Sequence, residues 1–189
     1  MLKPLGQYLK AEAAPRWQAI FFTWETLFSL AIVGVFVKCG DRLFETYPKV
    51  SDITTGVIAY ASIALGFCVA GLTISLTLPE PKFTLRLATH GGQKTSAYSD
   101  LLFVFSWTAF AHWIAVLTLF AFVLFVDGSA PLLPKGHSVS RTWVVALTAG
   151  LVSYCLCQFL ITLITLSQVG SVYIKFLAET PSKTGDGSR

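Results

Sequence analysis

Four long apolar segments divide this chain, and each has about the length that a helix needs to cross a lipid bilayer. They cover residues 17–37, 53–78, 101–126 and 142–167. A helix rises ~1.5 Å per residue and the hydrocarbon core of a bilayer is ~30 Å thick, so about 20 mostly apolar residues form one span. Helices satisfy their backbone polar groups internally, as lipid requires. We therefore predict an all-α polytopic membrane protein with four transmembrane helices.

The composition agrees with this fold class. Hydrophobic residues make up 54% of the chain and charged residues 13%, whereas soluble domains contain about a quarter of charged residues. The mean hydropathy is +0.66. The net charge of +4 is spread over loops and tails instead of forming a basic face, which argues against a nucleic-acid partner.

The distribution of cations predicts the orientation of the spans. With a cytoplasmic N terminus, nine Lys and Arg residues lie on the inner side and five on the outer side, together the 14 of the chain. The positive-inside rule then favours an up-down antiparallel bundle with both termini in the cytoplasm. The predicted segments are a cytoplasmic N-terminal segment (1–16), the first span (17–37), an outer loop (38–52), the second span (53–78), a cytoplasmic loop (79–100), the third span (101–126), an outer loop (127–141), the fourth span (142–167), a cytoplasmic helix extension (168–179) and a disordered tail (180–189).

Glu25 is the single charge inside the first span. Counted from Trp17, it lies ~12 Å inside the membrane, where an ionised carboxylate costs at least a few kcal/mol unless it is paired or faces water. His112, in the third span, reaches a comparable depth of ~16 Å, and Thr108 shares its helix face. The predicted intramembrane polar layer comprises Glu25, His112, Thr108, Ser62, Tyr154 and Gln158.

Two interpretations of this layer remain open. In the first, Glu25 and His112 form a proton-sensitive pair that biases helix packing or coupled transport. In the second, a protonated Glu25 donates a hydrogen bond to His112, Thr108 or a backbone carbonyl and holds the bundle in register. Such interhelical hydrogen bonds contribute only ~0.6 to 2 kcal/mol.

Small residues recur along the second span. Ser62, Gly66 and Ala70 lie four residues apart on one helix face, a spacing that lets another helix approach closely in lipid. We predict a helix-packing surface there.

The last apolar segment continues in helical pattern to about Leu177, longer than one span requires. Its projecting part would carry an apolar face, and such a face outside the membrane favours docking of a partner protein. The predicted docking residues are Val169, Val172, Tyr173 and Phe176. In the preceding loop, Phe83 and Leu87 form a short apolar face that we expect on the bilayer surface.

No sequence motif supports catalysis or a cofactor. His112 is the one histidine within a span, which argues against a transmembrane haem with two axial histidines. The chain contains no GxSxG or HExxH motif and no carboxylate-rich metal site. The four cysteines form no CxxC pair, so we expect neither a metal site nor a disulfide. We predict that the protein is not an enzyme.

Two functional classes remain. The first is a non-catalytic membrane subunit that self-assembles or anchors a soluble cytoplasmic partner, as a membrane anchor or sensor. The second is a homo-oligomeric ion channel or proton-coupled small-solute transporter that uses Glu25 with His112. One acid in the first of four spans resembles the small multidrug exporters in that single respect. Short loops and the absence of Asn, hence of N-glycosylation sites, favour a bacterial inner membrane surrounded by membrane lipids as the location.

Overall fold

The structure, a computed structural model, describes residues 16, 20, 23–43, 49–77, 81–89, 97–125, 127–129, 131–133 and 138–179. The elements of this part of the chain are helices, together with one isolated β-bridge between Lys49 and Pro131. The helices are α3 (Trp24–Leu43), α4 (Val50–Leu76), α5 (Pro81–Thr89), α6 (Ala97–Phe125) and α7 (Val139–Glu179). Apart from Arg16, the predicted N-terminal segment lies outside the described residues, and so does the predicted tail 180–189.

Three of the described helices, α4, α6 and α7, are long and apolar enough to cross a membrane. Their most apolar stretches each have a mean hydropathy of 2.1. The helices of the described part of the chain thus have the length and apolar character of an integral membrane protein, and the predicted all-α membrane fold class is confirmed at this level.

The region of the predicted first span has different helix limits from those expected. Thr23 lies in a bend, α3 begins at Trp24, and the helix continues through Lys38 to Leu43. Residues 17–19 and 21–22 lie outside the described part. Glu25 consequently lies in the first turn of α3, where the helix dipole favours an acid. The predicted depth of Glu25, ~12 Å, was counted along one continuous helix from Trp17. In the structure the described helix begins only at Trp24, so this count does not apply to α3.

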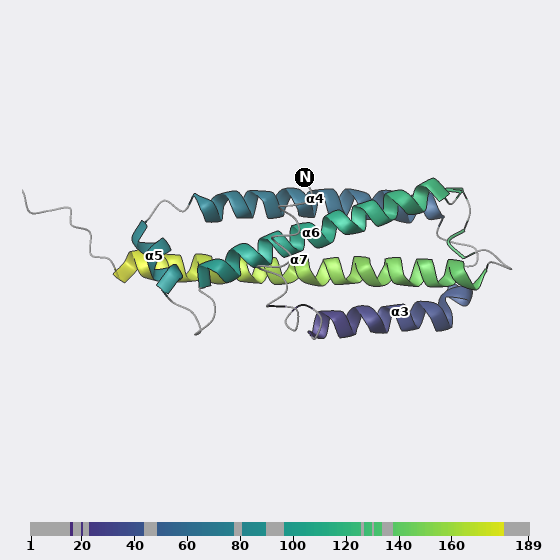
Figure 1. The fold of residues 1–189 in the computed structure, drawn as a ribbon, viewed down its shortest axis with the longest axis horizontal. Coiled ribbons are helices and arrows are strands. Elements are labelled where there is room, and N and C mark those ends of the chain that lie inside the picture. Colours follow the sequence, from purple (N-terminus) through teal and green to yellow (C-terminus); the bar gives the residue numbers. More distant parts are fainter. Residues whose placement is uncertain are drawn as a thin grey trace, which may run out of the picture.

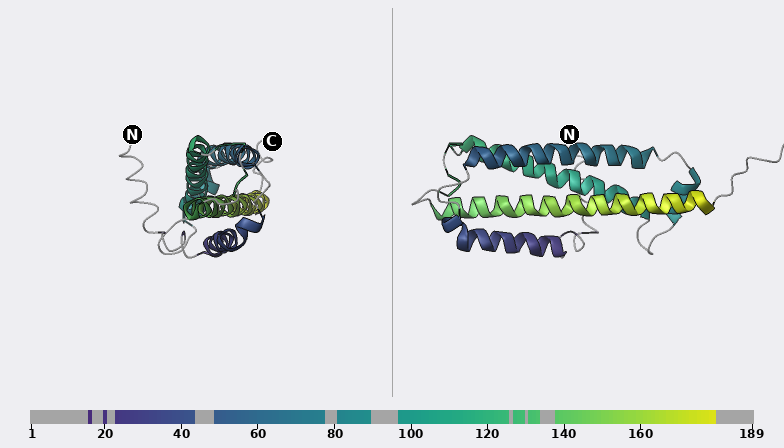
Figure 2. Two further views of the ribbon diagram at one scale, coloured as in Figure 1. Left: turned by 90° about the vertical axis from the view of Figure 1, so that its right-hand side faces the viewer. Right: turned by 180° about the vertical axis from the view of Figure 1, so that it is seen from behind.

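The helices are arranged side by side in the order α4, α6, α7, α3 (Figure 1). The end view in Figure 2 shows α3 against α7, on the side of α7 away from α4. We call the end that carries residues 127–129 and 131–133 the loop end and the end that carries α5 the cap end. Helix α3 ends, α4 begins, α6 ends and α7 begins at the loop end, so the four long helices alternate in direction along the chain.

Glycines allow two of these helix contacts to be close. At Gly71 of α4, an added Cβ would overlap the ring of Phe105 on α6. At Gly150 of α7, an added Cβ would lie 2.5 Å from Cγ2 of Val33 and 3.3 Å from the carbonyl oxygen of Ser29, both on α3. Small residues at such contacts let helices pack tightly in lipid, where van der Waals contact contributes much of the association energy.

Helix α5 folds back on the end of α7. Phe83 is fully buried, and its ring centroid lies 4.8 Å from that of Tyr173 and 5.4 Å from that of Phe176. Leu87, one turn later, is also buried. The apolar face of α5 that we expected on the bilayer surface instead packs within the protein, because the end of α7 supplies an aromatic surface for it.

Candidate functional site

A chain of buried and partly buried polar side chains links α4, α6 and α7. Nε2 of His112 lies 3.0 Å from the hydroxyl of Tyr60, and Nδ1 of His112 lies 2.8 Å from the carbonyl oxygen of Thr108. Because a carbonyl oxygen can only accept, Nδ1 carries the proton, and in a neutral imidazole Nε2 then accepts from the Tyr60 hydroxyl. Phe159 of α7 packs edge-on against both rings.

A second pair of hydroxyls continues this chain toward α7. Thr162 donates to the carbonyl oxygen of Gln158 at 2.8 Å, and its Oγ1 lies 2.8 Å from that of Thr108. The hydroxyl proton of Thr162 is thus used within α7, so Thr108 donates to Thr162 across the helix interface. Trp107 also donates from Nε1 to the hydroxyl of Tyr154 at 2.8 Å. Four of the predicted layer residues, Thr108, His112, Tyr154 and Gln158, therefore lie along the facing surfaces of α6 and α7.

Glu25 is buried between α3 and α7. Its exposed fraction is 5%, and its Oε2 has no hydrogen-bond partner among the described residues. The carboxyl lies close enough to Tyr154 and Cys157 of α7 to interact electrostatically with both. Burial of a carboxyl oxygen without a hydrogen bond costs free energy. Glu25 differs in this respect from His112, because both ring nitrogens of His112 have hydrogen-bond partners.

The predicted pairing of Glu25 with His112 is not formed: within the described residues no hydrogen bond or ion pair joins them. The physical reason is the helix order. Helix α3 packs on α7, whereas the imidazole bonds to α4, and α7 lies between α3 and α4 (Figure 2). The predicted hydrogen bond from Glu25 to Thr108 is absent for the same reason, because the Thr108 hydroxyl bonds to α7.

Ser62 does not join the polar layer. Its side chain is exposed on α4, and its hydroxyl donates to the carbonyl oxygen of Ile58 in the same helix. Gly66 and Ala70 are exposed on the same face, and a Cβ added at Gly66 would meet no described atom within 4 Å. The small-residue face therefore points away from the other helices of this chain.

The predicted docking residues divide into two groups. Tyr173 and Phe176 contact Phe83 of α5. Val169 packs against the buried cluster around Phe105. These three docking residues therefore have partners within the chain. Val172 is exposed. The face of α7 that we expected to be open is thus partly covered by α5.

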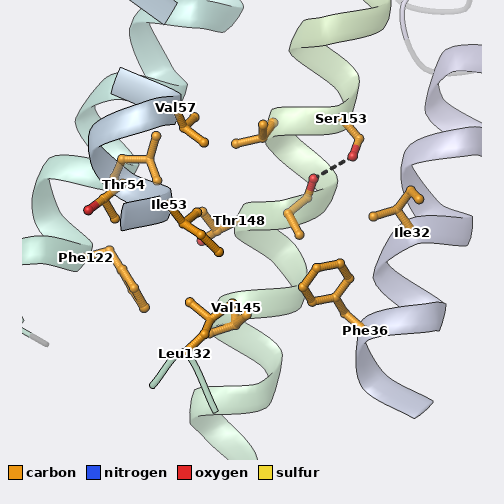
Figure 3. Close-up of a pocket in the computed structure, with 13 residues that line it drawn as sticks. Ile32, Phe36, Ile53, Thr54, Val57, Phe122, Leu132, Val145, Thr148 and Ser153 are labelled. Carbon is orange, nitrogen blue, oxygen red and sulfur yellow. Dashed lines mark hydrogen bonds between the residues drawn. The ribbon is translucent and has the colours of Figure 1, made fainter. Parts of the chain in front are cut away.

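An apolar cavity of about 300 Å³ lies at the loop end between α3, α4, α6 and α7 (Figure 3). Its hydroxyl-bearing residues offer no free donor, because Thr54, Thr148 and Ser153 each donate to a carbonyl oxygen of their own helix at 2.8 Å. The cavity can therefore accept only an apolar group. The other residues around it are Ile32, Phe36, Ile53, Val57, Leu119, Phe122, Leu132, Val145, Ala149 and Val152.

The described residues contain no cluster of His, Cys, Asp or Glu that could hold a metal ion. All four cysteines are free thiols. Cys39 is exposed, whereas Cys68, Cys155 and Cys157 are buried and act as packing residues.

Sequence reasoning missed two members of the polar chain, Tyr60 and Thr162. Thr162 lies four residues after Gln158 and so shares its helix face, a spacing that could have identified it. Tyr60 had no comparable signal, since its partner His112 lies on another helix. No protein-family model, curated protein or solved structure matches this chain.

Proposed function

We propose that this chain is a non-catalytic subunit of a bacterial inner membrane that anchors a soluble cytoplasmic partner and assembles with copies of itself. The cap end carries the proposal. There α5 and the end of α7 pack together beyond the ends of α4 and α6 (Figure 1). Their surface still exposes Leu85 by 65%, Ile174 by 68% and Leu177 by 50%. An exposed apolar surface of this kind is typical of a protein interaction site.

The length of α7 supports a location of the cap outside the membrane. Its 41 residues correspond to ~60 Å of helix, about twice the ~30 Å hydrocarbon core. Tilting accommodates only part of this excess. The α5 sequence is also much more polar than that of the long helices, and Lys82 is exposed on it.

The topology that we propose retains four spans, with α3 as part of the first. The outer side of α3 carries exposed large apolar side chains, among them Leu27, Leu30 and Val35, as expected for a lipid-facing surface. Four spans place both termini, and with them the cap, on the cytoplasmic side.

Self-assembly is supported by the small-residue face of α4. Ser62, Gly66 and Ala70 are exposed and leave room for a second backbone. In lipid, a face of this type favours close contact between helices of two copies.

The test is purification of the full chain from its native membrane in nanodiscs, with the mass of the complex measured and a photo-crosslinking residue placed at Ile174. We expect one soluble protein at fixed stoichiometry, crosslinked at Ile174. The double variant Leu85→Glu, Ile174→Glu should lose it, whereas the matched charge change Lys82→Glu should retain it. A monomer without a partner, or retention of the partner by the double variant, would contradict the proposal.

Glu25 favours a second candidate, a proton-coupled channel or transporter. Carboxyl groups buried among membrane helices often line ion pathways, and Glu25 has such a position, with an unbonded oxygen at the α3–α7 interface. In this second candidate the neighbours of Glu25 are Tyr154 and Cys157 of α7. His112 takes no part, because it belongs to the separate network with Tyr60.

This candidate is tested by proton and ion flux in liposomes that contain the purified protein. Flux that disappears in Glu25→Gln, with the oligomer mass unchanged, would support it. Flux that persists in Glu25→Gln would exclude a role for this carboxyl, and absence of flux in the native protein would exclude transport of the ions tested.

A further inference from the structure

A second hollow opens between α6 and α7 at the loop end, with a volume of about 770 Å³. We call it the α6–α7 groove. On α6 it is lined from Ile114 to Phe125, a distance of ~17 Å along the helix, which is close to half of the ~30 Å hydrocarbon core. Its length therefore matches the depth of one lipid monolayer.

The chemistry of the lining changes along the groove. The part farthest from the loop end is mainly apolar and includes Ile114 and Leu117 of α6. The hydroxyls of Thr118 and Thr148 donate to carbonyl oxygens of their own helices at 2.9 and 2.8 Å, so they present no free donor there. An apolar chain is thus the group that fits this part of the groove.

The edge of the groove is polar and cationic. It is formed by Ser138, Ser140 and Arg141 at the start of α7, and no acidic side chain is among the described residues that line it. Nε and Nη2 of Arg141 donate to the carbonyl oxygens of Leu132 and Pro131 at 3.1 and 2.9 Å. These bonds fix the guanidinium, and within the described residues its Nη1 has no hydrogen-bond partner. An oriented guanidinium is well suited to a phosphate group.

We propose that the α6–α7 groove binds one phospholipid, with an acyl chain along Leu117 and Ala121 and the phosphate at Arg141, Ser138 and Ser140. The polar edge lies where α6 ends and α7 begins, and the apolar part extends inward by one monolayer, so the order of polarity matches that of a lipid in the bilayer. The positive charge of Arg141 is complementary to the negative phosphate of the headgroup. The lining holds no acidic side chain that the phosphate would have to displace from Arg141.

Native mass spectrometry of the full chain in mild detergent tests this proposal with three probes: phosphatidylglycerol, diacylglycerol and inorganic phosphate. We expect phosphatidylglycerol to bind at least about tenfold more tightly than diacylglycerol, because charge-assisted hydrogen bonds contribute on this scale. Inorganic phosphate should not displace the lipid. Equal binding of the two lipids would overturn the headgroup assignment, and displacement by inorganic phosphate would identify a free-phosphate site instead.

Two tryptophan variants locate the lipid. Ala121→Trp fills the groove and should reduce phosphatidylglycerol binding about tenfold or more. Leu30→Trp places the same ring on the exposed outer side of α3, outside the groove and away from the small-residue face of α4, and should leave binding unchanged. If Ala121→Trp cannot be purified, Leu117→Trp and Arg141→Gln serve the same purpose. Lipid binding that is equal in the native protein and in the groove variants would place the lipid elsewhere and refute the proposal.

Discussion

The hydroxyl of Tyr60 donates to Nε2 of His112 over 3.0 Å and thereby joins α4 to α6 inside the bundle. His112 is fully buried, and its other nitrogen is occupied by the carbonyl oxygen of Thr108. Both nitrogens of the neutral imidazole therefore have hydrogen-bond partners. His112 has a structural role in this arrangement and is not the partner of Glu25.

Removal of this hydroxyl should destabilise the protein. In Tyr60→Phe, Nε2 of His112 loses its donor, and we expect a loss of about 0.6 to 2 kcal/mol in the free energy of unfolding. Thermal unfolding in detergent, followed by near-UV circular dichroism, measures it. Tyr98→Phe is the control, since the longer 3.3 Å bond from Tyr98 to Ser75 lies near the helix ends. Equal stability of Tyr60→Phe and the native protein would show that the contact contributes nothing.

The hydroxyl pair of Thr108 and Thr162 should be energetically coupled, since one donates to the other across α6 and α7. A double-mutant cycle with Thr108→Val and Thr162→Val should give a coupling free energy of about 0.6 kcal/mol, and no more than about 1.7 kcal/mol. Unfolding in mixed detergent micelles supplies the four free energies. A coupling of zero would mean that each hydroxyl is satisfied within its own helix.

Two glycines of α4 should respond differently to substitution by Ala. Gly71→Ala places a Cβ within the ring of Phe105, so we expect destabilisation by about 1 to 3 kcal/mol from overpacking. Gly66→Ala meets no described atom within 4 Å and should not destabilise the protomer. Midpoints of thermal unfolding compare the two. A loss in Gly66→Ala that depends on protein concentration would instead reveal contact between copies.

The α3–α7 contact should depend on Gly150. In Gly150→Ala the new methyl group crowds Val33 and Ser29 of α3, so we expect α3 to pack less closely on α7. Labelling of an introduced Ser29→Cys thiol by a membrane-permeable maleimide, in a background where the native cysteines are replaced by Ala, should become faster in Gly150→Ala. An unchanged labelling rate would show that the interface accommodates the methyl group.

Asp127 should give the loop end a weak acid sensitivity. Its Oδ1 accepts from the backbone N–H and the hydroxyl of Ser129 at 2.9 and 2.8 Å, and these bonds hold the pKa of the carboxyl below its ordinary value of 3.8. A lowered folded-state pKa stabilises the protein above the unfolded value, and the effect is lost as pH falls through the folded value.

We therefore expect the native protein to lose stability relative to Asp127→Asn as the pH is lowered from about 5 through 3.8 and below. The unfolding midpoint measured at a series of pH values gives the comparison. Parallel pH profiles for the native protein and Asp127→Asn would contradict the assignment.

The sequence by itself determined the long membrane helices. Segments such as 53–78 and 101–126 must bond their backbones internally in lipid, so apolar length alone predicts a helix. The spacing of Thr108 and His112 likewise predicted a shared face, because a helix returns to the same side after four residues.

Only the tertiary structure decided which faces meet. Every span is apolar on nearly all sides, so no amphipathic pattern reveals that His112 faces Tyr60, that Glu25 faces α7, or that Ser62 faces outward. The same is true of the cap, where Phe83 is buried because α7 extends far enough to reach it. The rotation of each helix and the order of its neighbours follow from packing between helices that are distant in the chain, which the apolar pattern of the sequence does not reveal.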